Sequence, residues 1–391
     1  MRKRSPMNFK KIFPILIVAL LAFSCNGSNS HIDIEDKGNE RISGYATYTD
    51  GTPIVGMVVS DGFSCVITDK EGHYSIESPS SNTFYIYASI PADCKIEENP
   101  DGNPDFYHKY TVERSIYDFN FERIEIENDF VLYALADPQC ANEKHIARFE
   151  SETVADIKET QKSEELPPYG ITLGDIVYSK GVRNCIPLMK EMRRIMSKSH
   201  IGFPIFQTMG NHDVFASTTQ PIEDLDFNLG FQRDFEKFFG PINYSWNRGE
   251  VHFIHMRNII FKDKSDFSSY ANGFTTSQVE WLKQDLMHVP KDKMVVLCVH
   301  IPLLRDIGAN IDSVRSALTS FVNVIVFSGH LHYMLNGLNL PLPELVHPAV
   351  CGAFWSSSLK GDGLLNGYGI HYFSGNKIVN SIFKGVKSGA E

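Results

Sequence analysis

The chain has 391 residues, and its apolar fraction of 42% is enough for a buried core in one large domain or two. The formal net charge is -10. No run of Lys or Arg follows the N-terminus, so the positive surface expected of a nucleic-acid-binding protein is missing. The composition therefore favours a globular protein that does not bind nucleic acid through electrostatics.

The N-terminus has the organisation of an export signal. Residues 2–11 are rich in Arg and Lys, and the apolar run at 12–24 has the length of a signal-peptide core. The following Ala22-Phe23-Ser24-Cys25 resembles a bacterial lipobox, in which the cysteine becomes the lipidated first residue. We therefore expect a lipoprotein signal peptide at 1–24, lipidation of Cys25, and an exported chain held by lipid on a bacterial membrane, periplasmic or at the cell surface. Ordinary signal cleavage near Ser24 is the alternative.

A tether and a small β-domain are predicted next. Residues 25–40 are polar and contain glycine, as in a flexible tether. Between 41 and 125, short alternating runs such as ISGYATY and TFYIYAS are separated by turn residues, which predicts a small all-β sandwich. The pattern DGTPI followed by TDKEGHY resembles transthyretin-like or carboxypeptidase-regulatory-like modules of exported bacterial proteins. This module carries no catalytic cluster, so we expect a structural or docking role.

The segment 126–387 alternates between strands and helices. Apolar runs at 130–136, 169–175, 203–210, 294–300 and 324–330 predict buried strands. Helical patterns occupy 143–162, 182–198, 277–289 and 310–321. This alternation predicts an α/β domain whose sheets are covered by helices. Functional residues in such domains lie where strands end.

Side chains typical of metal ligands follow five of these apolar runs. In chain order they are Asp137 and Gln139; Asp175; Asn211, with His212 and Asp213 beside it; His300; and His330 with His332. A single histidine after a strand is usually structural. Carboxylates, amides and four histidines gathered at one edge, however, would be costly to bury without a cation. The set therefore predicts a metal site.

The ordered motifs D-x-Q, G-D, G-N-H-D, a single H and G-H-x-H resemble the calcineurin-like metallophosphoesterase family, over Asp129 to Gly385. With the preceding sandwich, the chain resembles exported bacterial phosphoesterases that carry such an N-terminal module. The resemblance implies an α/β (α+β) metallophosphoesterase fold, with two mixed β-sheets flanked by helices. It also implies a metal-dependent phosphoric ester hydrolase with two divalent ions.

The resemblance assigns a role to each motif residue. It implies Asp137, Gln139, Asp175 and His332 as ligands of the first ion, and Asp175, Asn211, His300 and His330 as ligands of the second. Two ions about 3.5–4 Å apart can activate a bridging hydroxide for attack on a phosphomonoester or phosphodiester. His212 is implied as the general acid or as a stabiliser of phosphoryl charge.

Two positions depart from the usual family pattern. Gln139 stands where most members have histidine, and its amide oxygen is a harder and weaker donor. The amide donor therefore favours manganese, iron or magnesium over zinc. Tyr178 stands where many relatives place an acid that orients the histidine, and we expect Asp213 to take over that catalytic support.

Substrate contacts are expected from the segment 352–369, in particular from Trp355, Asp362 and Tyr368. Core packing is the equal alternative for the aromatic residues of this segment. Two divalent ions balanced by Asp137, Asp175 and one hydroxide leave net positive charge, which suits a phosphorylated small molecule or polymer as substrate. The rival hypothesis is a non-catalytic binding lipoprotein that holds a glycan or a protein. A serine hydrolase and an ATP-driven enzyme are disfavoured because the chain has neither a G-x-S-x-G elbow nor a P-loop.

Overall fold

The computed structural model describes residues 41–179, 185–214, 227–263, 268–304, 308–356 and 365–386. The expected signal peptide and tether, together with Cys25, lie outside the described residues, and so does Asp362.

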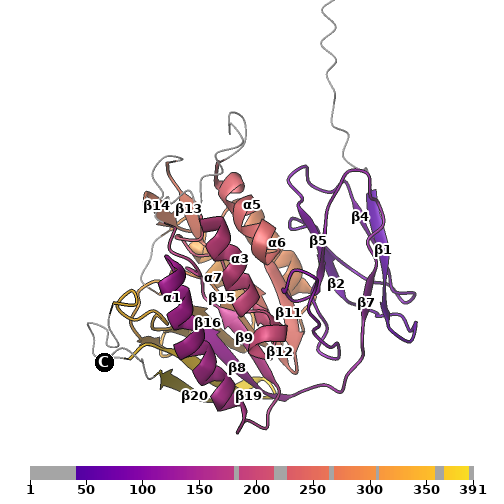
Figure 1. Cartoon of the computed structure of the whole chain (residues 1–391). Coiled ribbons are helices and arrows are strands. Elements are labelled where there is room, and N and C mark those ends of the chain that lie inside the picture. Colours follow the sequence, from indigo (N-terminus) through magenta and orange to yellow (C-terminus); the bar gives the residue numbers. More distant parts are fainter. Residues whose placement is uncertain are drawn as a thin grey trace, which may run out of the picture. The chain divides into compact units, whose positions relative to one another are not determined.

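The N-terminal part is all-β, as predicted, and consists of two sheets (Figure 1). The three-stranded sheet has the order β4-β1-β7, with β1 Arg41–Tyr48, β4 His73–Glu77 and β7 Phe119–Phe121. The four-stranded sheet has the order β3-β2-β5-β6, with β2 Val58–Ser60, β3 Cys65–Ile67, β5 Tyr85–Ala88 and β6 Tyr107–Lys109. Along β1 every second side chain is buried, so one face of this strand packs into the core.

This β-region is continuous with the rest of the molecule, since Gly38–Glu391 form one compact unit. Ile90 forms a parallel β-bridge with Trp246. The fully buried Arg248 guanidinium donates to the carbonyl oxygens of Ala92 (3.0 Å) and Cys94 (2.8 Å). The N-terminal sandwich is therefore fixed to the following domain by a shared core and by buried hydrogen bonds.

The following domain contains two larger mixed sheets. The five-stranded sheet has the order β10-β9-β8-β19-β20, with β8 Asp129–Leu135, β9 Pro168–Thr172, β10 Ile205–Phe206, β19 Gly367–Ser374 and β20 Lys377–Gly385. The six-stranded sheet has the order β11-β12-β15-β16-β18-β17, with β11 Tyr244–Arg248, β12 Val251–His255, β15 Met294–Cys298, β16 Asn323–Ser328, β17 Leu335–Gly337 and β18 Glu344–Val346. A separate hairpin pairs β13 Ile259–Phe261 with β14 Tyr270–Asn272. Three neighbouring strands of the five-stranded sheet run parallel to one another: β8, β9 and β10. Four strands of the six-stranded sheet also run parallel to one another: β12, β15, β16 and β18.

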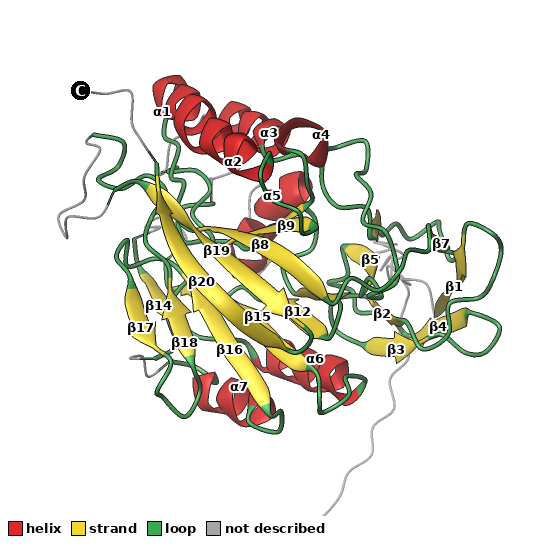
Figure 2. Ribbon diagram, turned by 90° about the horizontal axis from the view of Figure 1, so that it is seen from below, coloured by secondary structure: helices red, strands yellow, loops and turns green. Residues whose placement is uncertain are grey.

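Helices flank the two sheets, with α1 to α3 on one side and α6 and α7 on the other (Figure 2). The predicted helix at 143–162 is a continuous run of α1 Glu143–Arg148, the π-helical η1 Phe149–Val154 and α2 Ala155–Gln161. The remaining helices are α3 Cys185–Ile195, α4 Lys198–Ile201, α5 Phe227–Phe239, α6 Thr276–Met287 and α7 Ile311–Leu318. The metallophosphoesterase fold expected from the sequence, two mixed sheets between helices, is confirmed.

Helix α5 is an element that the sequence analysis did not single out. Its buried residues Phe231, Phe235, Phe238 and Phe239 have the spacing of one helical face. That periodicity was present in the sequence and could have identified the helix.

Strand β8 shows why the first apolar run is continuous. Phe130, Leu132 and Ala134 belong to the cluster that fills the space between the sheets. The alternate residues Val131 and Tyr133 belong to the cluster beneath the helices. Because both faces of β8 are covered by other parts of the protein, the residues on each face must be apolar. The polar residues after Leu135 therefore mark the point where the chain leaves the core.

Within the described ranges, no helix combines the length and the apolar character needed to cross a bilayer. The described part of the chain contains six cysteines, from Cys65 to Cys351. Five of them are buried, where a thiol packs as a small apolar group.

Candidate metal centre

The candidate ligands converge on one edge of the two sheets. Asp137 and Asp175 follow β8 and β9, and Asn211 follows β10. His300 follows β15, and the last two histidines follow β16. The strands within each set are parallel, so their carboxyl ends lie at the same edge. The five-stranded sheet thus supplies the acids and amides, and the six-stranded sheet supplies the histidines.

A first group joins Asp137, Asp175 and His332, whose ligand atoms all lie within 4.8 Å of one another. His332 Nε2 lies 3.3 Å from Asp137 Oδ1. Gln139 adds its amide to this group, since Nε2 lies 2.9 Å from Asp175 Oδ2 and 3.1 Å from His332 Nε2. These are the four residues expected to hold the first ion.

A second group joins Asp175, His300 and His330, again with ligand atoms within 4.8 Å of one another. His300 Nε2 lies 3.3 Å from Asp175 Oδ2 and 2.9 Å from Asn211 Oδ1. His330 Nδ1 lies 3.2 Å from His300 Nε2. Asp175 is common to both groups, which is the position required of a bridging ligand.

The donor set fits a pair of divalent cations. Gln139 Oε1 is buried and has no hydrogen-bond partner, and the buried Asp137 Oδ1 has the 3.3 Å contact with His332 Nε2 but no hydrogen bond. An orphaned buried oxygen costs free energy comparable to a lost hydrogen bond, and a bound cation would remove that cost. Carboxylate and amide oxygens combined with imidazole nitrogens suit manganese, iron, magnesium or zinc.

The backbone at this edge is strained. Of the nine residues other than glycine that have positive φ in the described part, seven lie at this site: Asp137, Gln139, Asp175, His330, His332, Phe354 and Trp355. Side chains with a Cβ rarely adopt this left-handed region, and such strain persists where the surrounding structure enforces it for function. The turns after the strands thus direct the candidate ligands inward at a conformational cost.

Glycine is required where two of these turns meet. A Cβ on Gly210 would lie 2.2 Å from Asp175 Oδ1, and one on Gly329 would lie 2.6 Å from Asp137 Oδ2. Both distances are too short for any side chain, so the glycines in the G-N-H and G-H-x-H motifs let neighbouring turns approach the carboxylates.

The buried charges perturb one another. Burial alone would lower the pKa of His300, but the adjacent Asp175 carboxylate outweighs it and raises that pKa to about 9. Burial opposes ionisation of Asp175, yet His300 holds the pKa of this carboxyl well below its usual range. Burial, with His300 nearby, lowers the pKa of His330 to about 4. Mutually perturbed groups of this kind are typical of functional sites.

Asn258 is a supporting residue that the sequence analysis missed. Its side-chain oxygen accepts from the backbone N–H of His300 (3.2 Å) and of Ile301 (3.1 Å), and its amide donates to Ile301 O (2.6 Å). The other ring nitrogen, His300 Nδ1, lies 2.8 Å from Leu173 O. These contacts direct His300 Nε2 toward Asp175, the usual way in which outer contacts orient a ligating histidine.

His212 lies beside the two groups, with its backbone N–H donating to Asp175 Oδ1 (2.8 Å). Its ring packs against Tyr178, with ring centroids 4.4 Å apart. Burial lowers the pKa of His212. Tyr178, at the position where many relatives place an acid, therefore contributes an aromatic contact to the histidine.

Asp213 does not take the place that we expected for it. Its carboxylate oxygens accept from the backbone N–H groups of Gly210 (2.8 Å) and Val177 (3.0 Å), and the side chain is fully buried. Burial, followed by the nearby Asp175 charge, raises its pKa to about 7. Asp213 joins the turns that carry Asp175 and Asn211, so its role is to hold those turns rather than to orient His212.

Two of the expected substrate contacts are also placed elsewhere. Trp355 is buried, and its Nε1 donates to Pro138 O (2.8 Å), beneath the loop that carries Asp137 and Gln139. Tyr368 is fully buried in β19, and its hydroxyl donates to Asp156 Oδ1 (2.7 Å). Both rings are thus buried against the protein instead of facing solvent. Their burial depends on packing between distant segments, which the sequence does not show.

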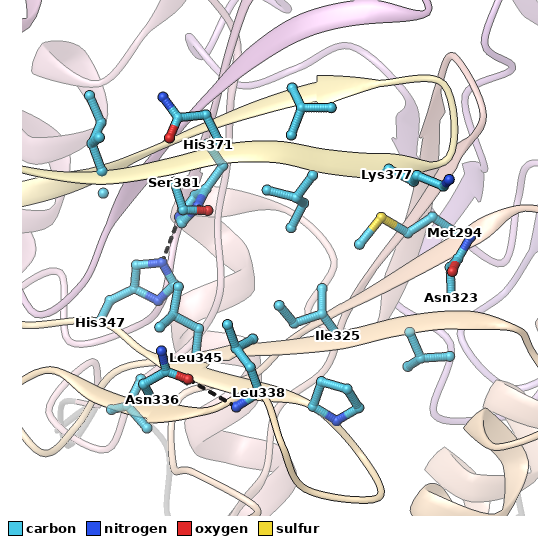
Figure 3. Close-up of a pocket in the computed structure, with 18 of the residues that line it drawn as sticks. Met294, Asn323, Ile325, Asn336, Leu338, Leu345, His347, His371, Lys377 and Ser381 are labelled. Carbon is cyan, nitrogen blue, oxygen red and sulfur yellow. Dashed lines mark hydrogen bonds between the residues drawn. The ribbon is translucent and has the colours of Figure 1, made fainter.

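A cavity of about 730 Å³ lies apart from this centre, and none of the candidate ligands lines it. Apolar residues such as Ile325 and Leu345 form its walls, and the buried His347 and His371 face each other with their Nε2 atoms 2.8 Å apart (Figure 3). His371 Nδ1 also lies 2.9 Å from Ser381 Oγ. The polar atoms of the histidine pair thus satisfy one another within the protein.

Comparison with known proteins gives matches to two family models and to several solved structures. The family model "Calcineurin-like phosphoesterase" matches residues 132–334, and "N terminal of Calcineurin-like phosphoesterase" matches residues 40–124. Among solved structures, a dimetal phosphatase from Danio rerio is similar with a TM-score of 0.45 and 12% identity, over 67% of this chain and 97% of that one. A purple acid phosphatase from yellow lupin seeds has a TM-score of 0.42 and 12% identity, over 85% and 66% of the two chains. A 5'-nucleotidase from Candida albicans has a TM-score of 0.38 and 14% identity, over 62% and 47%. No curated protein matches the chain.

Proposed function

The chain belongs to the calcineurin-like phosphoesterase family, whose model covers just over half of its length, and we propose that it hydrolyses a phosphomonoester or phosphodiester at this edge of the sheets. Family membership makes it a metal-dependent phosphoric ester hydrolase. The observation that supports the site is the pair of ligand groups that share Asp175.

Each group of side chains has a distinct task in this proposal. Asp137, Gln139, Asp175 and His332 would hold one divalent ion, and Asp175, Asn211, His300 and His330 would hold the other. Two such ions, when bound, supply Lewis-acid charge and activate a water molecule. The protein contributes a preorganised site: Asn258 and the Leu173 carbonyl fix His300, and Asp213 fixes the turns around Asp175.

We assign the role of proton donor to His212. It is the histidine next to Asn211 that does not belong to either ligand group, and its ring is held against Tyr178. In the proposed reaction His212 protonates the leaving-group oxygen or stabilises charge on the phosphoryl group.

Two measurements test the proposal against a binding lipoprotein. The first is the metal content of the purified protein after reconstitution with manganese, magnesium, iron or zinc. The second is turnover of p-nitrophenyl phosphate and of bis-p-nitrophenyl phosphate with each metal. We expect about two ions per chain and turnover of at least one ester. Less than one ion per chain and no turnover would favour the binding protein.

Gln139 provides a prediction about metal preference. Its amide contacts both Asp175 and His332, so an imidazole at this position supplies a nitrogen donor to the same group. We expect Gln139→His to retain the first ion more tightly during mild chelation and to shift the best activating metal toward zinc.

The control for this change is Gln139→Ala, which removes the donor. We expect it to lose the first ion more readily than the parent protein. If both variants keep the metal content and the metal preference of the parent, Gln139 is not a ligand.

We also propose that the chain is exported and anchored by lipid on Cys25. The basic cluster, the apolar core and the Ala-Phe-Ser-Cys sequence support this location. The test is mass spectrometry of the mature N-terminus together with membrane fractionation of the parent and of Cys25→Ser. A soluble parent protein whose N-terminus lies at another residue would contradict the anchor.

A further inference from the structure

Phe354 is an exposed aromatic side chain in a strained position beside the metal centre. Its side chain is 51% exposed, although it is large and apolar, and its φ is 54°. Trp355, the next residue, is also left-handed, with a φ of 62°. Two consecutive aromatic residues in this region carry a conformational cost that the surrounding structure must impose.

The segment around Phe354 is anchored against the first ligand loop. Ala349 forms a parallel bridge with Ala136, and the N–H of Val350 donates to Ala136 O (2.7 Å). Trp355 then donates through its indole to Pro138 O. With both sides of the segment fixed to the chain around Asp137, the exposed Phe354 ring is held in place relative to the candidate ligands.

The Phe354 ring faces two residues of the site. Its centroid lies 5.0 Å from the ring of His332 and 6.0 Å from the ring of Tyr178. Tyr178 in turn packs on His212 at 4.4 Å. The order of rings is therefore His332, Phe354, Tyr178 and His212, which runs from a candidate ligand to the proposed proton donor.

This order fixes which part of a substrate Phe354 would meet. In its proposed role as general acid, His212 acts on the leaving-group oxygen, so the groups beside it lie on the leaving-group side of the reacting phosphorus. Tyr270, by contrast, contacts His330, on the side of the other ligand group. Phe354, which is 51% exposed, therefore lies on the leaving-group side.

We propose that Phe354 is a specificity-determining residue that stacks on a planar aromatic ring in the leaving group, so that the enzyme selects aromatic phosphoesters over aliphatic ones. This inference rests on the proposed phosphoesterase function and adds the substrate class. An aromatic ring gains an offset or edge contact with Phe354, and the contact removes apolar surface of both groups from water. The Tyr178 ring, which contacts Phe354, forms one side of this stacking surface.

The test uses pairs of substrates that differ by an aromatic ring. The first pair is 2-naphthyl phosphate against phenyl phosphate, in which the leaving groups have similar acidity and differ in stacking area. The second pair is adenosine 5'-phosphate against ribose 5-phosphate, in which the leaving oxygen is the same and the ring lies one sugar away. The quantity is the ratio of kcat/KM within each pair, for the parent, for Phe354→Ala and for Leu338→Ala.

Leu338 is the matched control because it is a bulky apolar residue of similar exposure, 46%, that lines the separate cavity. We expect the parent to prefer the larger aromatic substrate in at least one pair, and Phe354→Ala to reduce that ratio by about 3- to 10-fold, the size of one aromatic contact. Leu338→Ala should keep the parent ratio. The substrate pair whose ratio falls in Phe354→Ala shows whether the preferred aromatic ring is bonded directly to the leaving oxygen or is joined to it through a sugar.

The outcomes separate this inference from the function on which it rests. An unchanged ratio in both pairs, or an equal loss for aromatic and aliphatic esters in Phe354→Ala, would overturn the stacking role. Binding of 2-naphthyl phosphonate and of methyl phosphonate to the metal-loaded protein gives a readout without turnover. If the parent binds both phosphonates equally, the inference fails even when hydrolysis is observed. If no ester is hydrolysed but Phe354→Ala weakens naphthyl binding alone, the ring site stands and the hydrolase proposal fails.

Discussion

Replacement of Asp175 by asparagine should abolish phosphoester hydrolysis and leave the fold intact. Asp175 is the residue shared by both ligand groups, so its carboxylate is the one donor that both ions would need. The loss in turnover should exceed the roughly 10–100-fold that follows from removing a group that only supports a ligand. The measurements are kcat/KM with p-nitrophenyl phosphate and the metal content of the same sample.

The fold should survive because asparagine can keep the local contacts. The N–H of His212 can still donate to the amide oxygen at position 175. On the other side, Asp175 Oδ2 accepts from Gln139 Nε2, and the Oε1 atom of that glutamine has no partner. A rotation of the Gln139 amide would bring this oxygen toward the new NH₂ group. Loss of one buried negative charge also relieves Asp213, whose pKa is raised by burial and then by Asp175.

The matched control for this variant is Asp156→Asn. Asp156 is a partly buried acid that accepts from Tyr368 (2.7 Å) and pairs with Lys384 (2.6 Å), at α2 rather than at the sheet edge. We expect Asp156→Asn to keep its turnover, and both variants to give the circular dichroism spectrum of the parent. Parent-like turnover in Asp175→Asn would refute the proposed dinuclear site.

The sequence was sufficient for the candidate ligands because each motif is local. An apolar strand that ends in Gly-Asp or Gly-His-x-His identifies both the sheet and the turn at which its chain leaves the core. The position of each ligand relative to the others then follows from parallel strand order. Aspartate and histidine adopt the left-handed region more often than most residues, so the positive φ values of the two acids and the two histidines agree with their identity. The positive φ of Gln139 could not be foreseen in this way.

The expected substrate contacts were less predictable because they depend on packing between distant segments. Trp355 and Phe354 are neighbours in the chain, yet Trp355 is buried against the loop that carries Pro138 and Phe354 is exposed. Asp213 similarly lies one residue from His212, yet its carboxylate turns to the N–H groups of Gly210 and Val177. In both cases the type of residue was informative and the direction of its side chain was not.

Replacement of His212 by alanine should reduce turnover by about 10²- to 10⁴-fold, the usual effect of losing a general acid. The metal content should stay near that of the parent, because the contact between residue 212 and Asp175 is made by the backbone N–H, which alanine keeps. The protein should also remain folded, since the lost ring packs mainly on Tyr178 at the edge of the site. A matched control is His200→Ala, which removes a histidine that pairs with Glu150 (2.9 Å) and belongs to neither ligand group.

The leaving group decides which role His212 plays. A proton donor matters most when the leaving oxygen is strongly basic, so the loss in His212→Ala should be larger for phenyl phosphate than for p-nitrophenyl phosphate. The comparison of kcat/KM for these two esters, in the parent and in the variant, measures this difference. An equal loss on both esters would show that His212 stabilises phosphoryl charge or orders the site through Tyr178, and the assignment as general acid would be wrong.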